Sequence, residues 1–264
     1  MATGNTISAK LADIQASKTA LISAIQAQGV TVPTGAKLAD LATLIAAIST
    51  DITPFRVAWE CDSSLLTALT VPDGIQKIGS NRFSGFARLQ TVTFADSVKM
   101  IDMFAFSGCK ALRSLDIPSS VTTLEAGAFS QCTSLASVKF NGSVTLMGTV
   151  FKGCTALTTF YLSKGSVGYS VCEGCTGLTS ITLGSGVSFV DSDAFKGCTA
   201  VETLSIFMNA DSATIGANAF SGIPASCQVN FYGLKASIQA MENYPWGLAS
   251  GTPVHTNSGD FTIA

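Results

Sequence analysis

The sequence predicts a solenoid of about seven repeats, with a parallel β-sheet along one side. The first observation is a phrase that recurs along the chain and starts at an anchor residue, usually Phe. The anchors are Phe83, Phe106, Phe129, Phe151, Cys172, Phe195 and Phe220. The second observation is that successive anchors lie 23, 23, 22, 21, 23 and 25 residues apart. Self-similarity at this period is typical of a solenoid, in which each unit buries its apolar face against its neighbours.

A strand motif follows each anchor and is the third observation. In one unit it is Leu112-x-x-Leu115-x-Ile117, and the other units repeat it with similar apolar residues. The alternation from Leu115 to Ile117 predicts a short strand with an inner and an outer face. A polar turn and a second apolar pair, such as Val121 and Leu124, complete the unit. We therefore expect the strands to stack into one parallel sheet over residues 65–223.

Cysteine occupies one fixed repeat position, three residues after the anchor, as Cys109, Cys132, Cys154, Cys175 and Cys198. Equivalent positions of a solenoid stack at roughly the 4.8 Å spacing of strands, and a buried Cys behaves as a small apolar side chain. We therefore expect a ladder of reduced core thiols, with disulfide pairing as the alternative. The pair Cys172-x-x-Cys175 is half of a zinc or redox motif, but no second pair with a His lies nearby. We expect no metal and no cofactor.

The N-terminal segment, residues 1–50, is predicted to be an α-helical module. Its first helix would span residues 5–28 and its second about 37–48. Heptad spacing in the first helix places one Lys in an otherwise apolar seam, formed by Ile7, Leu11, Ile14, Lys18, Leu21 and Ile25. Short helices with unburied apolar stripes favour association, so we expect homo-oligomerisation or attachment through this module. The alternative is a helical hairpin that only caps the solenoid, and residues 51–64 would form a connector and N-terminal cap.

The C-terminal segment, residues 224–264, is predicted to be an α/β cap. A brief helix is expected over residues 236–243, followed by Tyr244 and Trp246 lying over the last repeat. The sequence Asn257-Ser-Gly-Asp260 is typical of the turn of a terminal hairpin. The single His of the chain, His255, lies in this hairpin without an obvious partner.

Composition excludes several classes of function. The net charge is −2 and only 12% of residues are charged, which argues against nucleic-acid binding because that requires a basic surface. No apolar run reaches the roughly 18 residues needed to cross a bilayer, so we expect no membrane insertion. The N-terminus shows no pattern of a secretory signal. No Ser or Cys has a recognisable base partner, so we expect the protein not to be an enzyme.

The outer face of the predicted sheet is the candidate binding surface. One of its columns contains only small hydroxyl residues, which β-propensity alone explains. The neighbouring column, called the varied column below, consists of Thr93, Asp116, Lys139, Tyr161, Thr182 and Ser205. This mixture of a donor, an acceptor and an aromatic ring suits a polar ligand such as a glycan. The alternative is an ordinary solvated sheet face.

The recurring phrase resembles the BspA-like leucine-rich repeat. It matches over about 160 residues as Phe-x-Gly-Cys-x-x-Leu-x-x-Leu-x-Ile-Pro, for example from Phe106. The resemblance implies a right-handed, curved leucine-rich repeat solenoid with a role in binding or adhesion, usually on a bacterial surface. Two units depart from the pattern. In the repeat at 141–172 the stretch Asn141-Gly-Ser is short and Cys172 replaces the anchor Phe, and the unit before Phe220 carries extra residues around 209–211. We expect local bulges at both.

The two ends resemble segments of phage and prophage proteins of the tail or fibre type. These segments are residues 25–41 and the stretches 239–248 and 254–263. This resemblance implies a virion component that binds a host-surface glycan or protein, with other virion proteins as partners. The alternative is a BspA-like adhesin on the bacterial cell surface.

Overall fold

A computed structural model describes residues 18–19, 22–23, 66–71, 73–209, 213–233 and 235–264. Lys18, Thr19, Ile22 and Ser23 are helical. The rest of the predicted helical module lies outside the described residues, and so do Ile7, Leu11, Ile14, Leu21 and Ile25 of its seam. The connector over residues 51–64 also lies outside them. The module and its role in oligomerisation therefore stay predictions.

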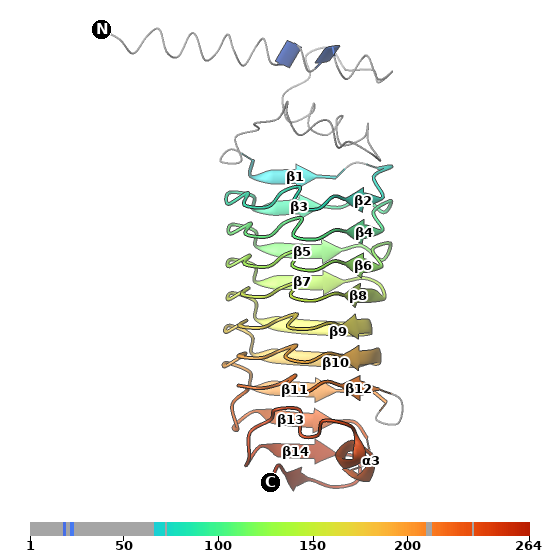
Figure 1. The fold of residues 1–264 in the computed structure, drawn as a ribbon, viewed down its shortest axis with the longest axis vertical. Coiled ribbons are helices and arrows are strands. Elements are labelled where there is room, and N and C mark those ends of the chain that lie inside the picture. Colours follow the sequence, from blue (N-terminus) through green and yellow to red (C-terminus); the bar gives the residue numbers. More distant parts are fainter. Residues whose placement is uncertain (1–17, 20–21, 24–65, 72, 210–212, 234) are drawn as a thin grey trace, which may run out of the picture.

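The described chain forms a parallel β-solenoid of about eight turns, stacked in a column (Figure 1). One strand from each turn contributes to a first ladder of parallel strands, which backbone pairing divides into two separate pairs and one longer continuous run; Asp116, for example, pairs with Lys139. This ladder contains β1 (Ala68–Thr70), β3 (Thr91–Thr93), β5 (Ser114–Ile117), β7 (Ser137–Phe140), the first parts of β9 (Thr159–Val167) and β10 (Ser180–Val190), β11 (Thr203–Ile206), β13 (Gln228–Phe231) and β14 (Pro253–Thr256). The predicted alternation is confirmed, since Leu115 and Ile117 are buried and Ser114 and Asp116 are exposed.

A second parallel ladder runs beside the first, where the sequence predicts only an apolar pair after a turn. It contains β2 (Lys77–Ile78), β4 (Met100–Ile101), β6 (Thr123–Leu124), β8 (Val144–Leu146), the second parts of β9 and β10, and β12 (Thr214–Ile215). The prediction of a single sheet is therefore wrong. These segments are extended and their backbone groups bond to the next turn, since each needs a partner for its N–H and C=O. β9 and β10 run through both ladders (Figure 1).

The anchor Phe side chains form a column inside the solenoid, which Cys172 interrupts between Phe151 and Phe195. Phe106 and Phe129 are stacked with ring centroids 5.2 Å apart, and Phe129 and Phe151 are 5.9 Å apart. All three side chains are fully buried. Phe195 and Phe220 are stacked in the same way at 5.9 Å. The recurring aromatic position thus fixes the register of each turn on the next.

The regular position of Cys within the repeat produces a second internal column, as predicted. Seven Cys of the described chain are buried and free. The thiol of Cys132 donates to the carbonyl oxygen of Phe106 at 3.3 Å, and that of Cys154 donates to Phe129 at 3.2 Å. Cys109, Cys175 and Cys198 make the same bond to the anchor of the previous turn, at 3.2, 3.1 and 3.2 Å. Cys therefore adds a weak donor that suits this carbonyl, besides filling space.

Each turn of the solenoid needs a left-handed backbone conformation two residues before its anchor. The residues there include Asn81 with φ 55°, Gly127 with φ 66° and Asn218 with φ 57°. Asn and Gly tolerate this region. Thr149, with φ 61°, does not share this tolerance because its side chain is β-branched. The backbone N–H of Thr149 donates to Tyr169 at 2.8 Å, which holds the strained turn in place.

The first ladder continues beyond Ile223, where the sequence predicts that the repeats end. β13 pairs in parallel with β11, and β14 pairs in parallel with β13. The inner positions are filled as in earlier turns, by Val229, Phe231 and Val254, and this explains why the sheet extends. The chain then ends in β15 (Phe261–Thr262), which is antiparallel to β14, so the predicted terminal hairpin is confirmed. The role of residues 224–264 as a cap stays a prediction.

The last turns also carry a short helix and contain a buried Trp. α3 (Lys235–Ala240) lies near the C-terminal end of the column (Figure 1). Trp246 is only 2% exposed, its ring centroid lies 5.7 Å from that of Phe231, and its Nε1 donates to the carbonyl of Glu242 at 3.0 Å. Trp246 is therefore part of the core and is too buried to contact a ligand.

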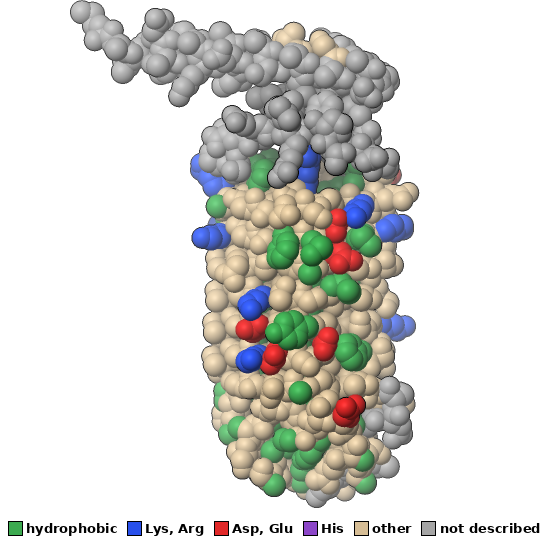
Figure 2. All heavy atoms as spheres, in the orientation of Figure 1, with side chains coloured by type: hydrophobic (Ala, Val, Ile, Leu, Met, Phe, Trp, Pro, Cys, Tyr) green, Lys and Arg blue, Asp and Glu red, His purple; other side chains and the backbone are tan. Residues whose placement is uncertain are grey.

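The surface carries few charges, and both signs are interspersed on the face drawn in Figure 2. The described ion pairs join neighbouring turns or neighbouring residues, such as Lys152 with Glu173 at 2.8 Å. In the part of the chain that the structure describes, no helix is long and apolar enough to span a membrane.

Candidate functional site

The first ladder brings the six residues of the varied column into one line on its outer face. Asp116 is the register partner of Lys139, and Thr182 is the register partner of both Tyr161 and Ser205. Thr93 lies on β3, next to β5 in the stack (Figure 1). The line extends at both ends, because Thr70 pairs with Thr93, Ser205 with Asn230, and Asn230 with His255.

The middle of the varied column projects most into solvent. Tyr161 is 56% exposed, and the side chains of Lys139 and Asp116 are 70% and 67% exposed. Lys139 Nζ lies 3.8 Å from Asp116 Oδ2, a loose ion pair that contributes little to stability at such exposure. These side chains therefore remain available for a ligand.

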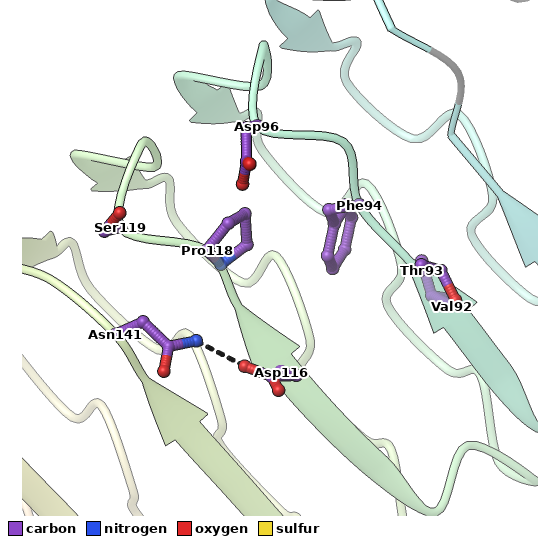
Figure 3. Close-up of a pocket in the computed structure, with 8 residues that line it drawn as sticks. All are labelled: Val92, Thr93, Phe94, Asp96, Asp116, Pro118, Ser119 and Asn141. Carbon is purple, nitrogen blue, oxygen red and sulfur yellow. Dashed lines mark hydrogen bonds between the residues drawn. The ribbon is translucent and has the colours of Figure 1, made fainter.

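A hollow near the N-terminal end of this face, the N-terminal hollow, contains two residues of the varied column. Its volume is about 510 Å3, and it is lined by Val92, Thr93, Phe94, Asp96, Asp116, Pro118, Ser119 and Asn141. Figure 3 shows Asp96 on one side and Asp116 with Asn141 on the other, with Phe94 and Pro118 between them. Asn141 Nδ2 donates to Asp116 Oδ1, and also to the carbonyl of Ile117 at 3.0 Å. The hollow thus combines an apolar floor with fixed polar groups.

A second hollow, the C-terminal hollow, lies at the other end of the same face. Its volume is about 220 Å3, and it is lined by Asn230, Phe231, Tyr232, His255, Thr256 and Asn257. His255 Nδ1 lies 2.9 Å from Asp260 Oδ2. His255 therefore has a partner, supplied by the turn of the terminal hairpin, where the sequence shows none.

Sequence reasoning misses most residues of both hollows. Asn141 and Tyr232 belong to a further outer column, one residue beyond each inner strand end, which also contains Pro118, Ser163, Gly184, Phe207 and Asn257. The varied chemistry of this column is visible in the sequence once the strands are aligned. Asn230 and His255 are missed because the repeats are predicted to end at residue 223, although Val229-x-Phe231 keeps the inner alternation.

The Cys side chains are poor candidates for chemistry. Burial raises the pKa of the Cys109 thiol to about 12 and that of Cys227 to about 11. Burial also raises the pKa of Cys172, which is fully enclosed. A reactive Cys needs a lowered pKa and access to solvent. Among the described residues, no three His, Cys, Asp or Glu side chains are grouped so that they could hold a metal ion.

The solenoid can be compared with known proteins. The family model for the BspA type leucine-rich repeat region, in six copies, matches residues 60–168 and 149–244. The chain belongs to the BspA-type leucine-rich repeat family. This confirms the family resemblance found in the repeat sequence. No curated protein is detectably similar to the chain.

Two solved structures support this assignment. The leucine-rich repeat protein of T. pallidum is 27% identical, with a TM-score of 0.53, and the match covers 60% of this chain and 78% of that one. A leucine-rich repeat protein from Eubacterium ventriosum is 25% identical, also with a TM-score of 0.53, and the match covers 74% of this chain. This BspA-type chain spans only 47% of the Eubacterium protein. Neither similarity concerns a phage protein, so the predicted resemblance of the two ends stays a prediction.

Proposed function

We propose that this BspA-type protein is a non-enzymatic adhesin that binds a polar ligand through the outer face of its first ladder. The observation that carries the proposal is the contrast between two neighbouring columns on the outer face of the first ladder. One column is uniform in small hydroxyl groups, whereas the varied column presents Asp116, Lys139 and Tyr161 in succession. Side chains at fixed strand spacing are preorganised, which lowers the entropic cost of binding.

The ligand class that suits this face is a surface glycan or a polar protein segment. Lys139 and Asp116 supply a donor and an acceptor, and Tyr161 supplies a half-exposed ring with a polar end. The N-terminal hollow adds an apolar floor beside Asp116. A small number of polar groups that converge over an apolar surface is typical of a ligand-binding site.

The location that fits this role is the bacterial cell surface. Membership of the BspA-type family supports it, whereas the virion assignment depends only on the short resemblances at the two ends. The two locations make different predictions. An antibody against the solenoid should label intact bacterial cells if the protein is a surface adhesin. Recovery of the protein only in purified phage particles would instead establish the virion assignment.

Oligomerisation through residues 1–50 is a separate proposal that light scattering tests. The full chain should be a multimer, and deletion of residues 1–50 should give a monomer. If the full chain is monomeric, the seam around Lys18 does not mediate oligomerisation.

Glycan-array binding tests the sheet face directly. The fluorescently labelled full chain should bind a subset of glycans, and Lys139→Ala and Tyr161→Ala should each weaken that binding about tenfold. Matched controls are Lys110→Ala and Tyr169→Ala, because both side chains are exposed and lie outside the first ladder. Binding that survives both sheet-face changes would exclude the centre of the varied column as the site.

A further inference from the structure

An aromatic pair stands beside the C-terminal hollow. Phe207 follows β11 and Tyr232 follows β13, in the same outer column. Their ring centroids lie 4.0 Å apart with an interplanar angle of 9°, yet the residues are 39% and 48% exposed. Here Phe207 backs one face of Tyr232 and so limits the freedom of the second ring.

Tyr232 also lines the C-terminal hollow. The column runs from Phe207 through Tyr232 towards Asn257, and Asn257 lines the hollow together with Tyr232. Since Phe207 covers the near face of the Tyr232 ring, the face that remains open is the one turned towards the hollow. This open ring face can pack on a flat, weakly positive surface, such as the C–H groups on one side of a pyranose ring.

Polar groups surround the same hollow at positions suited to hydroxyl groups. Asn230 and His255 are register partners on β13 and β14, and both line the hollow with Thr256. Asp260 Oδ2 lies 2.9 Å from His255 Nδ1, a position that favours a proton on Nδ1. In the neutral ring the proton is then on Nδ1, and Nε2 remains as an acceptor. The carboxylate thus orients the ring, much as an outer partner orients a metal-bound His.

Charge and size narrow the class of ligand. Among the described side chains that line the C-terminal hollow there is no Lys or Arg, whereas Asp260 holds a carboxylate 2.9 Å from His255 Nδ1. An acidic sugar would be repelled by this carboxylate. The volume of about 220 Å3 is below the roughly 300–1,000 Å3 of sites for drug-sized ligands, which fits one ring of a glycan.

We propose that the C-terminal hollow binds one neutral pyranose ring, stacked on the open face of Tyr232 and hydrogen-bonded by Asn230 and His255. This inference rests on the proposed adhesive function and adds a defined subsite at the end of the sheet face. The hollow lies several strands from Tyr161 and Lys139 (Figure 1), so the two parts of the face can be tested separately.

The test is saturation-transfer NMR on the full chain with methyl glycosides of glucose, galactose, mannose and N-acetylglucosamine. N-acetylneuraminic acid is the acidic comparison. We expect at least one neutral glycoside to bind at millimolar concentrations, with saturation strongest on C–H groups of one ring face. Tyr232→Ala and His255→Ala should weaken binding about tenfold or more, and Tyr232→Phe should keep most of it. Tyr169→Ala is the matched control, because Tyr169 is 51% exposed and outside this face.

Several results would overturn the inference. These are failure of every neutral glycoside to bind, stronger binding of the acidic sugar, or unchanged binding in both Tyr232→Ala and His255→Ala. Far-ultraviolet circular dichroism establishes that each variant is folded. If Lys139→Ala abolishes glycan-array binding while Tyr232→Ala has no effect on any ligand, the subsite is wrong and the adhesive function stands. If the wild-type chain binds nothing on the array or on cells, the proposed function itself fails.

Discussion

Replacing Phe129 with Ala should destabilise the solenoid strongly, because Phe129 lies in the middle of the aromatic column. Its side chain is fully buried and is stacked between Phe106 at 5.2 Å and Phe151 at 5.9 Å. Truncation of a buried Phe to Ala typically costs about 3–5 kcal/mol, which includes the cavity left behind. That is a large part of the roughly 5–15 kcal/mol by which most proteins are stable. With a urea m-value of about 3 kcal/mol/M, the unfolding midpoint should fall by about 1–2 M.

Urea unfolding followed by circular dichroism measures this loss, with Phe83→Ala as the matched control. Phe83 belongs to the same column, but it lies near the N-terminal end and is only partly buried. Its truncation should cost well under half as much. Hydrogen exchange should show the loss of protection in Phe129→Ala concentrated in the adjacent turns, since repeats interact with nearest neighbours. Equal losses for the two variants, or a loss below about 1 kcal/mol for Phe129→Ala, would refute the role assigned to the column.

Two further predictions concern backbone strain and buried thiols. Thr149→Asn should raise the free energy of unfolding by about 1 kcal/mol, because Asn adopts the left-handed conformation that Thr149 occupies at φ 61°; an unchanged or lower urea midpoint would contradict this. The pKa of Cys227 is raised by burial to about 11 from its ordinary value of 9.0, so the unfolded chain loses the thiol proton first as pH rises. The contribution of this thiol to the free energy of unfolding is complete below pH 9 and is lost as the pH rises to 11. The free energy falls by at most about 1.4 kcal/mol per pH unit over this range. Between these pH values the free energy of unfolding should therefore fall less steeply in Cys227→Ala than in the wild type. If the two proteins lose free energy in parallel as pH rises, the pKa of Cys227 is not raised.

The repeat made the solenoid predictable because period and alternation together specify which residues face inwards. Leu115 and Ile117 could be assigned to the core, and Ser114 and Asp116 to the outer face, without any structure. The second ladder could not be predicted in the same way. Its separate strands, such as β6 at Thr123–Leu124, are two or three residues long, too short for alternation to distinguish a strand from a turn.

The residues of the candidate site that occupy one repeated strand position could be predicted from the sequence. Those that meet through turns could not. The six residues of the varied column follow directly from the alignment of strand motifs. The two hollows depend on Asn141 bending back to Asp116 and on Asp260 reaching His255. Such contacts arise from loops whose course sequence spacing does not specify. The rigid stack of Phe207 on Tyr232 also required knowing that β13 continues the first ladder.

The bond from each of the five repeat Cys thiols to the anchor carbonyl of the turn before has a consequence for how the protein can change in length. Every such link joins immediate neighbours, as Cys132 joins Phe106 and Cys154 joins Phe129. An in-frame duplication or loss of one whole unit would break a link and restore an equivalent one at the new junction. Unequal recombination within the gene could thus lengthen or shorten the displayed surface by whole turns, leaving the remaining outer columns in line.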